Sequence, residues 1–470
     1  MAAPDASIDC TGLVVAPGFI DSHSHSDLQV LEPRPEKILQ GVTTEVVGNC
    51  GFSPYPAPPD PRPLREFANG IFCGDETWGW KSAAGYLAEV ERRATLTGAV
   101  SLVGHGTLRI FQAGHRLGAL SERDLQTMEG ALDEALAQGA AGLSTGLMYS
   151  PGESAPFEEL ERLCRVVARR GKIYTSHIRD YAARLPEAVE EQLELARRTG
   201  CRLQISHLQA VGPGNWPKQA AAIEKIEEAR AGGLDVAFDC YPYVAGSTVL
   251  TQLLPQWVLE GGNTGMVARL SDPEQRRAIA RETVRGIAQR WSDLYISAAS
   301  TPAGKRLVGR HLEEIAAERG CEPVDALIDI LIEESGNVNV LEFNQSQDNL
   351  RQLLAHPLGA VISDGFYVKG RPHPRLHGTF PFLLGEICRN RNWLSLPEAI
   401  RKITSWPAQR FGMKDRGCLR PGCFADVVVF DPAGVGSAAS YENPQVPPSG
   451  IQAVYRGGHR LVNRGNIQAA

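Results

Sequence analysis

Long apolar runs are missing from this chain of 470 residues. No stretch of eighteen consecutive apolar residues occurs, so the sequence predicts no membrane-spanning helix and no membrane partner. The first ten residues, MAAPDASIDC, have neither the charged start nor the apolar core of a secretory signal. We therefore predict a cytoplasmic protein.

An excess of positive charge is also missing. The chain has 48 Lys and Arg residues against 54 Asp and Glu residues, which gives a formal net charge of −6. Proteins that bind the phosphate backbone of nucleic acids usually present a basic surface. We therefore expect no nucleic acid partner, and nothing in the sequence indicates an oligomeric state.

The ten cysteines lack the spacing of a disulfide framework, because they are scattered singly and include no C-x-x-C pair. Most of them are therefore predicted to be small buried hydrophobic residues. Hydrophobic residues make up 43% and charged residues 22% of the chain, as in ordinary globular proteins. A chain of this length exceeds one typical core, so we expect a large domain with a smaller one beside it.

Short apolar runs that end in polar or glycine residues alternate with stretches of helical periodicity. Eight such runs occur in order: GFIDSHSH, TTEVVGNC, AVSLVGHG, AAGLSTG, KIYTSHI, RLQISHL, DVAFDCY and GAVISDG. The stretches between them, such as DLQTMEGALDEALAQG and PEAVEEQLELARRTG, end at a glycine typical of a helix C-cap. Eight strand–helix repeats predict an α/β protein with a (β/α)₈ TIM-like barrel.

We assign this barrel to residues 13–414. Two further strand-like runs, YISAAS and VNVLEFN, fall between the seventh and eighth barrel strands and predict an insertion at about residues 246–345. Beyond Gly417, short alternating runs with glycine and proline turns predict a small β-sandwich-type domain. We expect this domain to comprise residues 1–12 and 415–470, with most of its strands from the C-terminal part.

Side chains that can bind a metal follow four of the predicted barrel strands. They are His23 and His25 after the first strand, His177 after the fifth, His207 after the sixth and Asp364 after the eighth. The carboxyl ends of barrel strands meet at one rim, so these side chains are expected to converge. A single histidine at such a position is more often a hydrogen-bonded core residue, but the ordered set predicts a metal site.

Cys50 closes the run of the second strand within the motif GNCGFSP. A thiolate at this position can ligate zinc and can hold cations that neutral imidazoles bind less firmly. A buried small hydrophobic residue is the alternative interpretation. The glycines near Cys50 favour the metal ligand, because they allow the backbone to turn the side chain inward.

The motifs APGFIDSHSHSD, VVGNCGFSP, STGLMYSPG, TSHIRD, QISHLQAVG, DCYPYVAGST, ISDGF and HPRLHGTFP resemble those of the N-acyl-D-amino-acid deacylases, or D-aminoacylases, of the amidohydrolase superfamily. They extend over about residues 16–382, and GCLRPGCFADVVVFD resembles the C-terminal β-domain of that superfamily. The cysteine of GNCGFSP is specific to the D-aminoacylase branch. This resemblance implies zinc-dependent hydrolysis of the amide bond of a small N-acyl-D-amino acid.

The resemblance also implies a role for individual residues. Cys50, His177 and His207 would bind one tightly held Zn²⁺, while His23 and His25 with Cys50 would form a second, weaker site. Asp364 would be the general base, and Tyr241 would polarise the scissile carbonyl. Arg375 would bind the substrate carboxylate, and Ser247 and Tyr149 would line the substrate pocket.

Two features depart from the family pattern. The family usually has a lysine two residues after the histidine of the sixth strand, where it helps to bind the substrate carboxylate, and this chain has Gln209. A neutral amide at Gln209 predicts a less positive pocket. The family also has several short strands before the barrel, whereas about a dozen residues precede it here, so we expect either a start upstream of Met1 or a reduced small domain.

Two other functions fit parts of this pattern. Ring opening of a cyclic amide, as in hydantoinases and dihydroorotases, uses the same barrel and metal chemistry, but a lysine would be expected at the position of Cys50. A catalytically inactive barrel that serves as a scaffold predicts the loss of at least one reactive residue. The predicted metal ligands and Asp364 are all present.

Overall fold

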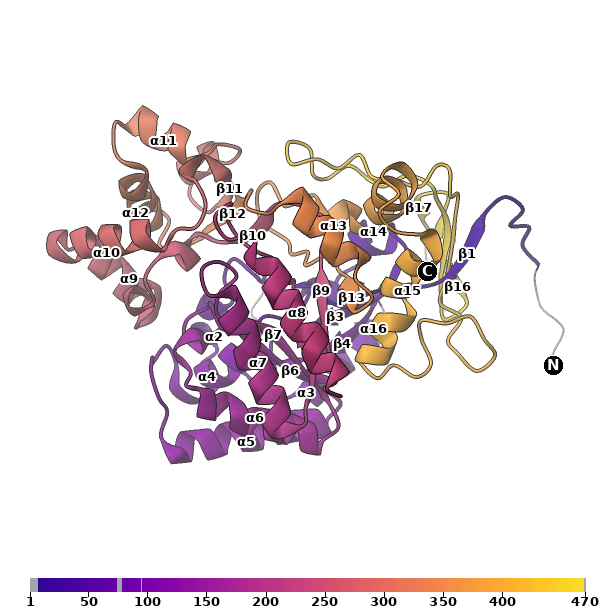
Figure 1. Cartoon of the computed structure of the whole chain (residues 1–470), viewed down its shortest axis with the longest axis horizontal. Helices are drawn as coiled ribbons and strands as arrows, with labels where there is room; N and C mark the ends of the chain where they lie inside the picture. Colours follow the sequence, from indigo (N-terminus) through magenta and orange to yellow (C-terminus); the bar gives the residue numbers. More distant parts are fainter. Residues whose placement is uncertain (1–6, 74–77, 94, 469–470) are drawn as a thin grey trace.

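The structure is a computed structural model that describes residues 7–73, 78–93 and 95–468 (Figure 1). Residues 1–6, which belong to the expected small domain, lie outside the described residues, as do residues 469–470. Among the described helices, none has the length and apolar character needed to cross a membrane.

A ring of parallel strands forms the centre of the molecule. Its strands are β2 (Phe19–Asp21), β3 (Val42–Val47), β4 (Gly98–Ser101) with β5 (Val103–Gly104), β6 (Gly142–Gly146), β7 (Ile173–His177), β8 (Arg202–Ile205), β9 (Val236–Cys240) and β13 (Gly359–Val361). The order β2-β3-β4 continues across Leu102 into β5-β6-β7-β8-β9-β13. Ser24 and Gly365 form a parallel bridge just beyond β2 and β13, so the last strand meets the first. The eight predicted runs therefore form the eight strands of a TIM-like barrel.

Helices between these strands and after the last of them pack on the barrel and on one another. They are α1 (Pro35–Ile38), α2 (Arg62–Phe67), α3 (Ala83–Arg93), α4 (His105–Ala113), α5 (Glu122–Ala137), α6 (Phe157–Arg169), α7 (Leu185–Thr199), α8 (Lys218–Ala231), α13 (Gln347–Ala355), α14 (Arg375–Phe382), α15 (Leu396–Lys402) and α16 (Ser405–Arg410), and a π-helical segment, Leu383–Asn390, continues α14. The predicted end signals are present. Ser121 and Asp124 form a capping box at the start of α5, and Gly200 ends α7 in a left-handed conformation.

The predicted insertion between β9 and β13 forms a compact unit with its own apolar core. It contains β10 (Gly246–Val249), α9 (Gly262–Ser271), α10 (Pro273–Gly286), β11 (Leu294–Ala299), α11 (Leu312–Arg319), α12 (Pro323–Glu333) and β12 (Val338–Glu342). Its three strands pair in the order β10-β12-β11, with β12 antiparallel to both neighbours. Helices α9–α12 project from one end of the molecule (Figure 1).

A five-stranded antiparallel sheet lies at the opposite end, near the C-terminus (Figure 1). Its strands are β1 (Val14–Pro17), β14 (Val427–Phe430), β15 (Ile451–Arg456), β16 (His459–Asn463) and β17 (Asn466–Ile467). Residues 14–17 were expected in the barrel, but they pair with β14 because the chain reaches β2 only after crossing this sheet. The sheet shares the main core with the barrel, where Phe19 packs against Phe430 and Phe380.

Candidate metal centre and active site

The side chains expected to bind metal meet at the carboxyl-terminal rim of the barrel. Three of the six described non-glycine residues with positive φ lie there: Cys50 (52°), His207 (33°) and Asp364 (49°). The left-handed region costs free energy for residues with a side chain, so surrounding contacts must hold it, and it is frequent in functional sites. The chain therefore turns at Cys50, His207 and Asp364, which follow β3, β8 and β13.

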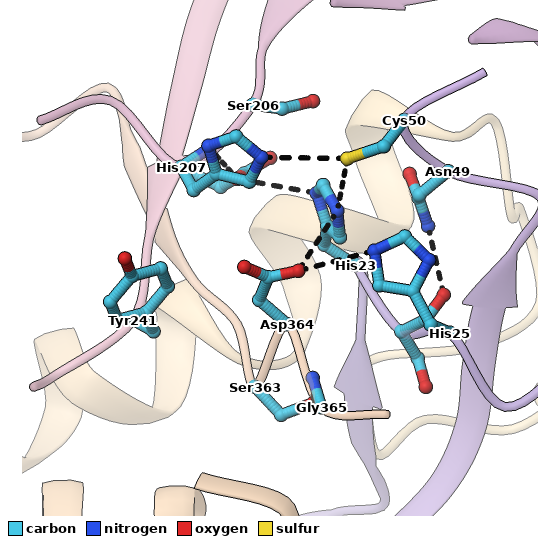
Figure 2. A network of polar contacts seen from close by, with 12 residues as sticks. His23, His25, Asn49, Cys50, Ser206, His207, Tyr241, Ser363, Asp364 and Gly365 are labelled. Carbon is cyan, nitrogen blue, oxygen red and sulfur yellow. Dashed lines mark hydrogen bonds and ion pairs between the residues drawn. The ribbon is translucent and has the colours of Figure 1, made fainter. Parts of the chain in front are cut away.

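Figure 2 shows Cys50 between two imidazoles, with Asp364 on the far side of His23. The Cys50 Sγ lies 3.3 Å from His23 Nε2 and 3.4 Å from His207 Nε2. The Asp364 Oδ1 lies 3.4 Å from His23 Nε2 and 3.3 Å from His25 Nε2. His177, which Figure 2 does not label, packs edge to face on His207 with 4.7 Å between the ring centroids.

Among the described residues, three groups of side chains could each hold a metal ion, because the possible ligand atoms within each group lie within 4.8 Å of one another. The groups are His23 with His25 and Cys50, Cys50 with His177 and His207, and His23 with His207 and Asp364. Neither ring nitrogen of the buried His177 has a hydrogen-bond partner among the described residues, and His207 Nδ1 also lacks one. Buried polar atoms without partners cost free energy unless a ligand satisfies them. One thiolate with several imidazoles is a donor set that suits zinc, so these residues fit that ion.

Arg375 forms an ion pair with Asp364. Its Nη2 is 3.0 Å from Asp364 Oδ2, and the guanidinium carbon lies 4.6 Å from the centroid of the Tyr241 ring. Arg375 is 1% exposed, and its Nε and Nη1 have no hydrogen-bond partner among the described residues. Two N–H donors of this buried cation are therefore available to an anionic ligand.

The hydroxyl of Tyr241 is held by two amides. It donates to Gln209 Oε1 at 2.8 Å and accepts from Gln345 Nε2 at 2.8 Å. Gln345 follows the insertion strand β12, and no sequence motif indicated a role for it. Gln209 therefore contacts Tyr241 directly in the position where the family pattern has a lysine.

These groups surround a cavity of about 570 Å³ between the barrel rim and the insertion. The predicted site residues on its wall are His25, Cys50, Tyr149, His177, His207, Gln209, Tyr241, Ser247 and Asp364. Arg375 and His23 are not part of this wall. Tyr149 and Ser247 are joined to the insertion, because the Tyr149 hydroxyl lies 3.2 Å from Thr248 Oγ1 and Ser247 is part of β10. The structure thus brings all the predicted site residues to one place.

The model of the amidohydrolase family matches residues 6–462. The chain belongs to the amidohydrolase family. The predicted likeness to the D-aminoacylase branch is also confirmed.

Three relatives illustrate this amidohydrolase branch. An N-acyl-D-glutamate deacylase of Alcaligenes xylosoxydans xylosoxydans is 37% identical over 98% of this chain and 85% of the relative. A D-aminoacylase of the same organism is 35% identical over 97% of this chain and 86% of the relative. The crystal structure of the N-acyl-D-glutamate deacylase of Bordetella bronchiseptica, in complex with zinc and a phosphonate mimic of the tetrahedral intermediate, has a TM-score of 0.81 at 35% identity. It covers 96% of this chain and 87% of that one.

Burial sets the protonation of the candidate metal ligands in this amidohydrolase. It lowers the pKa of His177 well below its ordinary value, and the nearby His207 lowers it further. Burial also lowers the pKa of His207 to about 4. Both imidazoles are therefore neutral near pH 7, which is the form that binds metals. Burial raises the pKa of the Cys50 thiol, so a bound cation would have to displace its proton.

Asp364 is ionised in spite of its environment. Burial opposes its charge, but the Arg375 guanidinium, followed by His23, holds the pKa of the carboxyl well below its ordinary value. In Tyr241, burial raises the pKa of the hydroxyl, so this group keeps its proton at neutral pH. The amidohydrolase therefore presents a carboxylate and a neutral phenol on the same cavity wall.

Two buried groups behind the rim were not predicted. Asp239, at the end of β9, accepts a hydrogen bond from the His207 backbone N–H at 2.6 Å, and its Oδ1 lies 3.7 Å from His23 Nδ1. Lys37 Nζ donates to Asp21 Oδ2 and to Ser363 Oγ, each at 2.5 Å, which ties β2 to β13 just below His23 and Asp364. The polar end of the run DVAFDCY could have revealed Asp239. Lys37 carries no such signal, because it lies in a short helix.

Proposed function

We propose that this amidohydrolase hydrolyses the amide bond of N-acyl-D-amino acids with zinc as its cofactor. The observation that carries this proposal is the meeting of a thiol, neutral imidazoles and the Asp364 carboxylate on one cavity wall, with donor groups for a carboxylate beside them. By their names, one relative is an N-acyl-D-glutamate deacylase and another is a D-aminoacylase. Both names support the same substrate class.

Cys50, His177 and His207 would hold the tightly bound zinc, and His23 and His25 with Cys50 would form a weaker second site. Both groups have ligand atoms within 4.8 Å of one another. Bound zinc lowers the pKa of a water and polarises a carbonyl group, which is the chemistry that an unreactive amide requires. Asp239 would fix the orientation of the histidines, since it contacts both His23 and His207.

Asp364 would act as general base and then as general acid. Its carboxylate is ionised and lines the cavity, so it can accept a proton from the attacking water. The same proton can then pass to the nitrogen of the departing amine as the C–N bond breaks. The products are a carboxylic acid and a free amino acid, and the carboxylate of Asp364 is restored.

Tyr241 would stabilise the oxygen of the scissile carbonyl as negative charge develops on it. Its hydroxyl keeps its proton at neutral pH and already donates a hydrogen bond, which is now accepted by Gln209. A substrate carbonyl that enters the cavity can replace Gln209 as acceptor, while Gln345 continues to hold the hydroxyl from the other side. A neutral donor aimed at the developing charge lowers the barrier of acyl transfer.

Arg375 would bind the α-carboxylate of the substrate. Its Nε and Nη1 have no hydrogen-bond partner among the described residues, so each can donate a hydrogen bond to a carboxylate oxygen. The cation lies behind the cavity wall, in contact with Asp364 and the Tyr241 ring. The substrate carboxylate would therefore enter beside the two proposed catalytic groups, which places the amide bond next to them. Ser247 and Tyr149 would line the rest of the pocket.

A substrate panel tests this proposal. The zinc-loaded enzyme is incubated with N-acetyl-D-amino acids, their L-enantiomers and cyclic ureides such as hydantoins, and amine release or ring opening is measured. We expect turnover of the linear D-substrates and loss of activity when zinc is removed with a chelator. Preferential opening of the cyclic ureides would instead identify a hydantoinase-type enzyme. A cytoplasmic location is proposed from the sequence alone and is tested by fractionation of the source cells.

A further inference from the structure

The insertion places a carboxylate on the wall of the substrate cavity. Glu342 is the last residue of β12 and lines the cavity together with Ser247 and Tyr241. It pairs with Gly246 of β10, a residue without a side chain that could cover it. A Cβ atom added to Gly246 would lie 3.3 Å from the Tyr241 hydroxyl, so Glu342 stands one strand away from the proposed reaction centre.

This carboxylate has few partners. Asn344 Nδ2 donates to Glu342 Oε2 at 3.1 Å, and within the described residues no Lys or Arg forms an ion pair with Glu342. Burial raises the pKa of Glu342 to about 7, and no neighbouring cation counteracts this effect. A carboxylate that is removed from water without a cation is stabilised when a cationic ligand arrives.

The other charged groups of the wall leave this position unpaired. The only cations on the wall are Arg179 and Arg285, among the residues that the structure describes. Arg179 is engaged elsewhere, because its Nε donates to Glu191 and its Nη1 and Nη2 donate to the backbone carbonyls of Glu153 and Ala155. Arg285 is exposed in the last turn of α10, at the outer edge of the cavity.

The residue at position 209 supports the same conclusion. Gln209 adds no positive charge to the wall, and its Oε1 is an acceptor already used by Tyr241. Arg375 therefore provides a cation behind the wall for the substrate α-carboxylate, and Glu342 is a carboxylate on the wall that has no counterion among the described residues. A substrate that is anionic at one end and cationic at its side chain complements this arrangement.

We propose that Glu342 determines the side-chain specificity of the enzyme and selects N-acyl-D-amino acids whose side chain carries a cation, such as an ammonium or guanidinium group. This inference rests on the proposed function and extends it to the substrate class. An acidic side chain, as in N-acyl-D-glutamate, would face a like charge and bind poorly. The chain would thus differ in substrate from its deacylase relative of the acidic type.

A pair of nearly isosteric substrates isolates the side-chain charge. N-acetyl-D-arginine and N-acetyl-D-citrulline differ in a guanidinium against a neutral urea, so the ratio of their kcat/KM values at pH 8 reports the charge preference. We expect the zinc-loaded native enzyme to favour arginine by about 10-fold or more, since coupling energies of close charge pairs reach this size. Glu342→Gln is expected to reduce the ratio to about 1.

Glu282→Gln is the matched control. Glu282 is an exposed carboxylate at the outer edge of the same cavity, where its Oε2 accepts a hydrogen bond from Trp257 Nε1 at 3.0 Å. The native ratio should persist in this variant. The inference is overturned if the native enzyme shows a ratio near 1, or if Glu342→Gln keeps the native ratio.

The neutral substrate separates the two proposals. Turnover of N-acetyl-D-citrulline without an arginine preference would leave the deacylase function standing and remove the role of Glu342. Failure of every N-acetyl-D-amino acid in the panel would remove the proposed function and, with it, this inference. The ratio of the native enzyme decides the matter even if Glu342→Gln does not fold.

Discussion

Arg375 Nη2 lies 3.0 Å from Asp364 Oδ2, so the group proposed to bind the substrate carboxylate is paired with the group proposed to move the proton. Both side chains are buried, and Arg375 is the main reason why the pKa of Asp364 falls in spite of that burial. A substrate carboxylate bound at the free Nε and Nη1 of Arg375, as proposed, would share this guanidinium with Asp364. Binding and proton transfer are therefore coupled through one ion pair.

Replacement of Arg375 should lower kcat/KM for substrates that carry a free carboxylate. Arg375→Ala is expected to lower kcat/KM for N-acetyl-D-amino acids. The decrease should correspond to a loss of about 2–4 kcal/mol of transition-state stabilisation, the range for losing one partner of a desolvated charge pair. Substrates with an amidated carboxylate should be affected less, because they offer no charge to pair. Steady-state kinetics on both substrate types measures the difference.

Arg371→Ala serves as the control for Arg375→Ala. Arg371 lies in the loop just before α14, but its Nη1 donates to the Tyr295 hydroxyl at 2.8 Å, away from the proposed carboxylate site. The Arg371→Ala variant should keep the native preference for substrates with a free carboxylate over those with an amidated one. Equal losses on acid and amide substrates in Arg375→Ala would contradict the carboxylate role.

Removal of the thiol should remove the metal. The Cys50 Sγ belongs to two of the three groups of ligand atoms, so Cys50→Ser is expected to lose most of its zinc and its activity. Metal content per chain after dialysis, determined by mass spectrometry, checks this outcome. Cys164→Ser is a suitable comparison, since Cys164 is a buried cysteine of the main core. A native zinc content in Cys50→Ser would exclude the thiolate-centred site.

Loss of the carboxylate should separate metal binding from proton transfer. Asp364→Asn is expected to retain tightly bound zinc, which Cys50, His177 and His207 would hold, but to lower kcat by about 10²–10⁴-fold. Zinc analysis and kinetics on the same preparation give both values. Turnover near that of the native enzyme would exclude Asp364 from the mechanism.

Loss of the phenol hydroxyl should affect kcat more than KM. Tyr241→Phe is expected to lower kcat by about 10²–10³-fold, because an oxyanion donor acts mainly in the transition state. The control is Tyr243→Phe in the same DCYPY motif, where the hydroxyl is buried and the ring stacks on Phe382 at 4.9 Å. A large rise in KM with unchanged kcat in Tyr241→Phe would assign this residue to substrate binding alone.

Glu342 should lower the stability of the protein at neutral and higher pH. Its pKa is about 7 in the folded chain against an ordinary value of 4.5, so between these values the folded state binds more protons than the unfolded state. The free energy of unfolding then falls as pH rises through this range. Glu342→Gln removes the effect and should be more stable than the native protein at pH 8 by roughly 1–3 kcal/mol, with a smaller gain at pH 5.

Thermal midpoints at the two pH values, compared with those of Glu282→Gln, measure this gain. The exposed Glu282 variant should show no pH-dependent difference from the native protein. An equal midpoint for Glu342→Gln and native protein at pH 8 would mean that the carboxyl of Glu342 titrates normally.

Local sequence patterns were enough to predict the barrel and the side chains at its rim. Alternating apolar runs and helical stretches are local patterns, and residues such as His177 and Asp364 follow their strands directly in sequence. Because parallel strands of a barrel end at one rim, the position of each side chain along the chain was enough to predict that they meet. The same local patterns indicated β11 and β12 of the insertion and the C-terminal strands of the small sheet, but not β10 or β1.

The partners of these side chains depend on how distant segments pack against one another. The pair of Arg375 with Asp364, the contact of Gln209 and Gln345 with Tyr241, and the place of Glu342 on the cavity wall all join distant segments. Periodicity does not encode such contacts, because they depend on how the insertion packs over the barrel rim. For the same reason residues 14–17 looked like part of the barrel, although pairing with β14 places them in the C-terminal sheet.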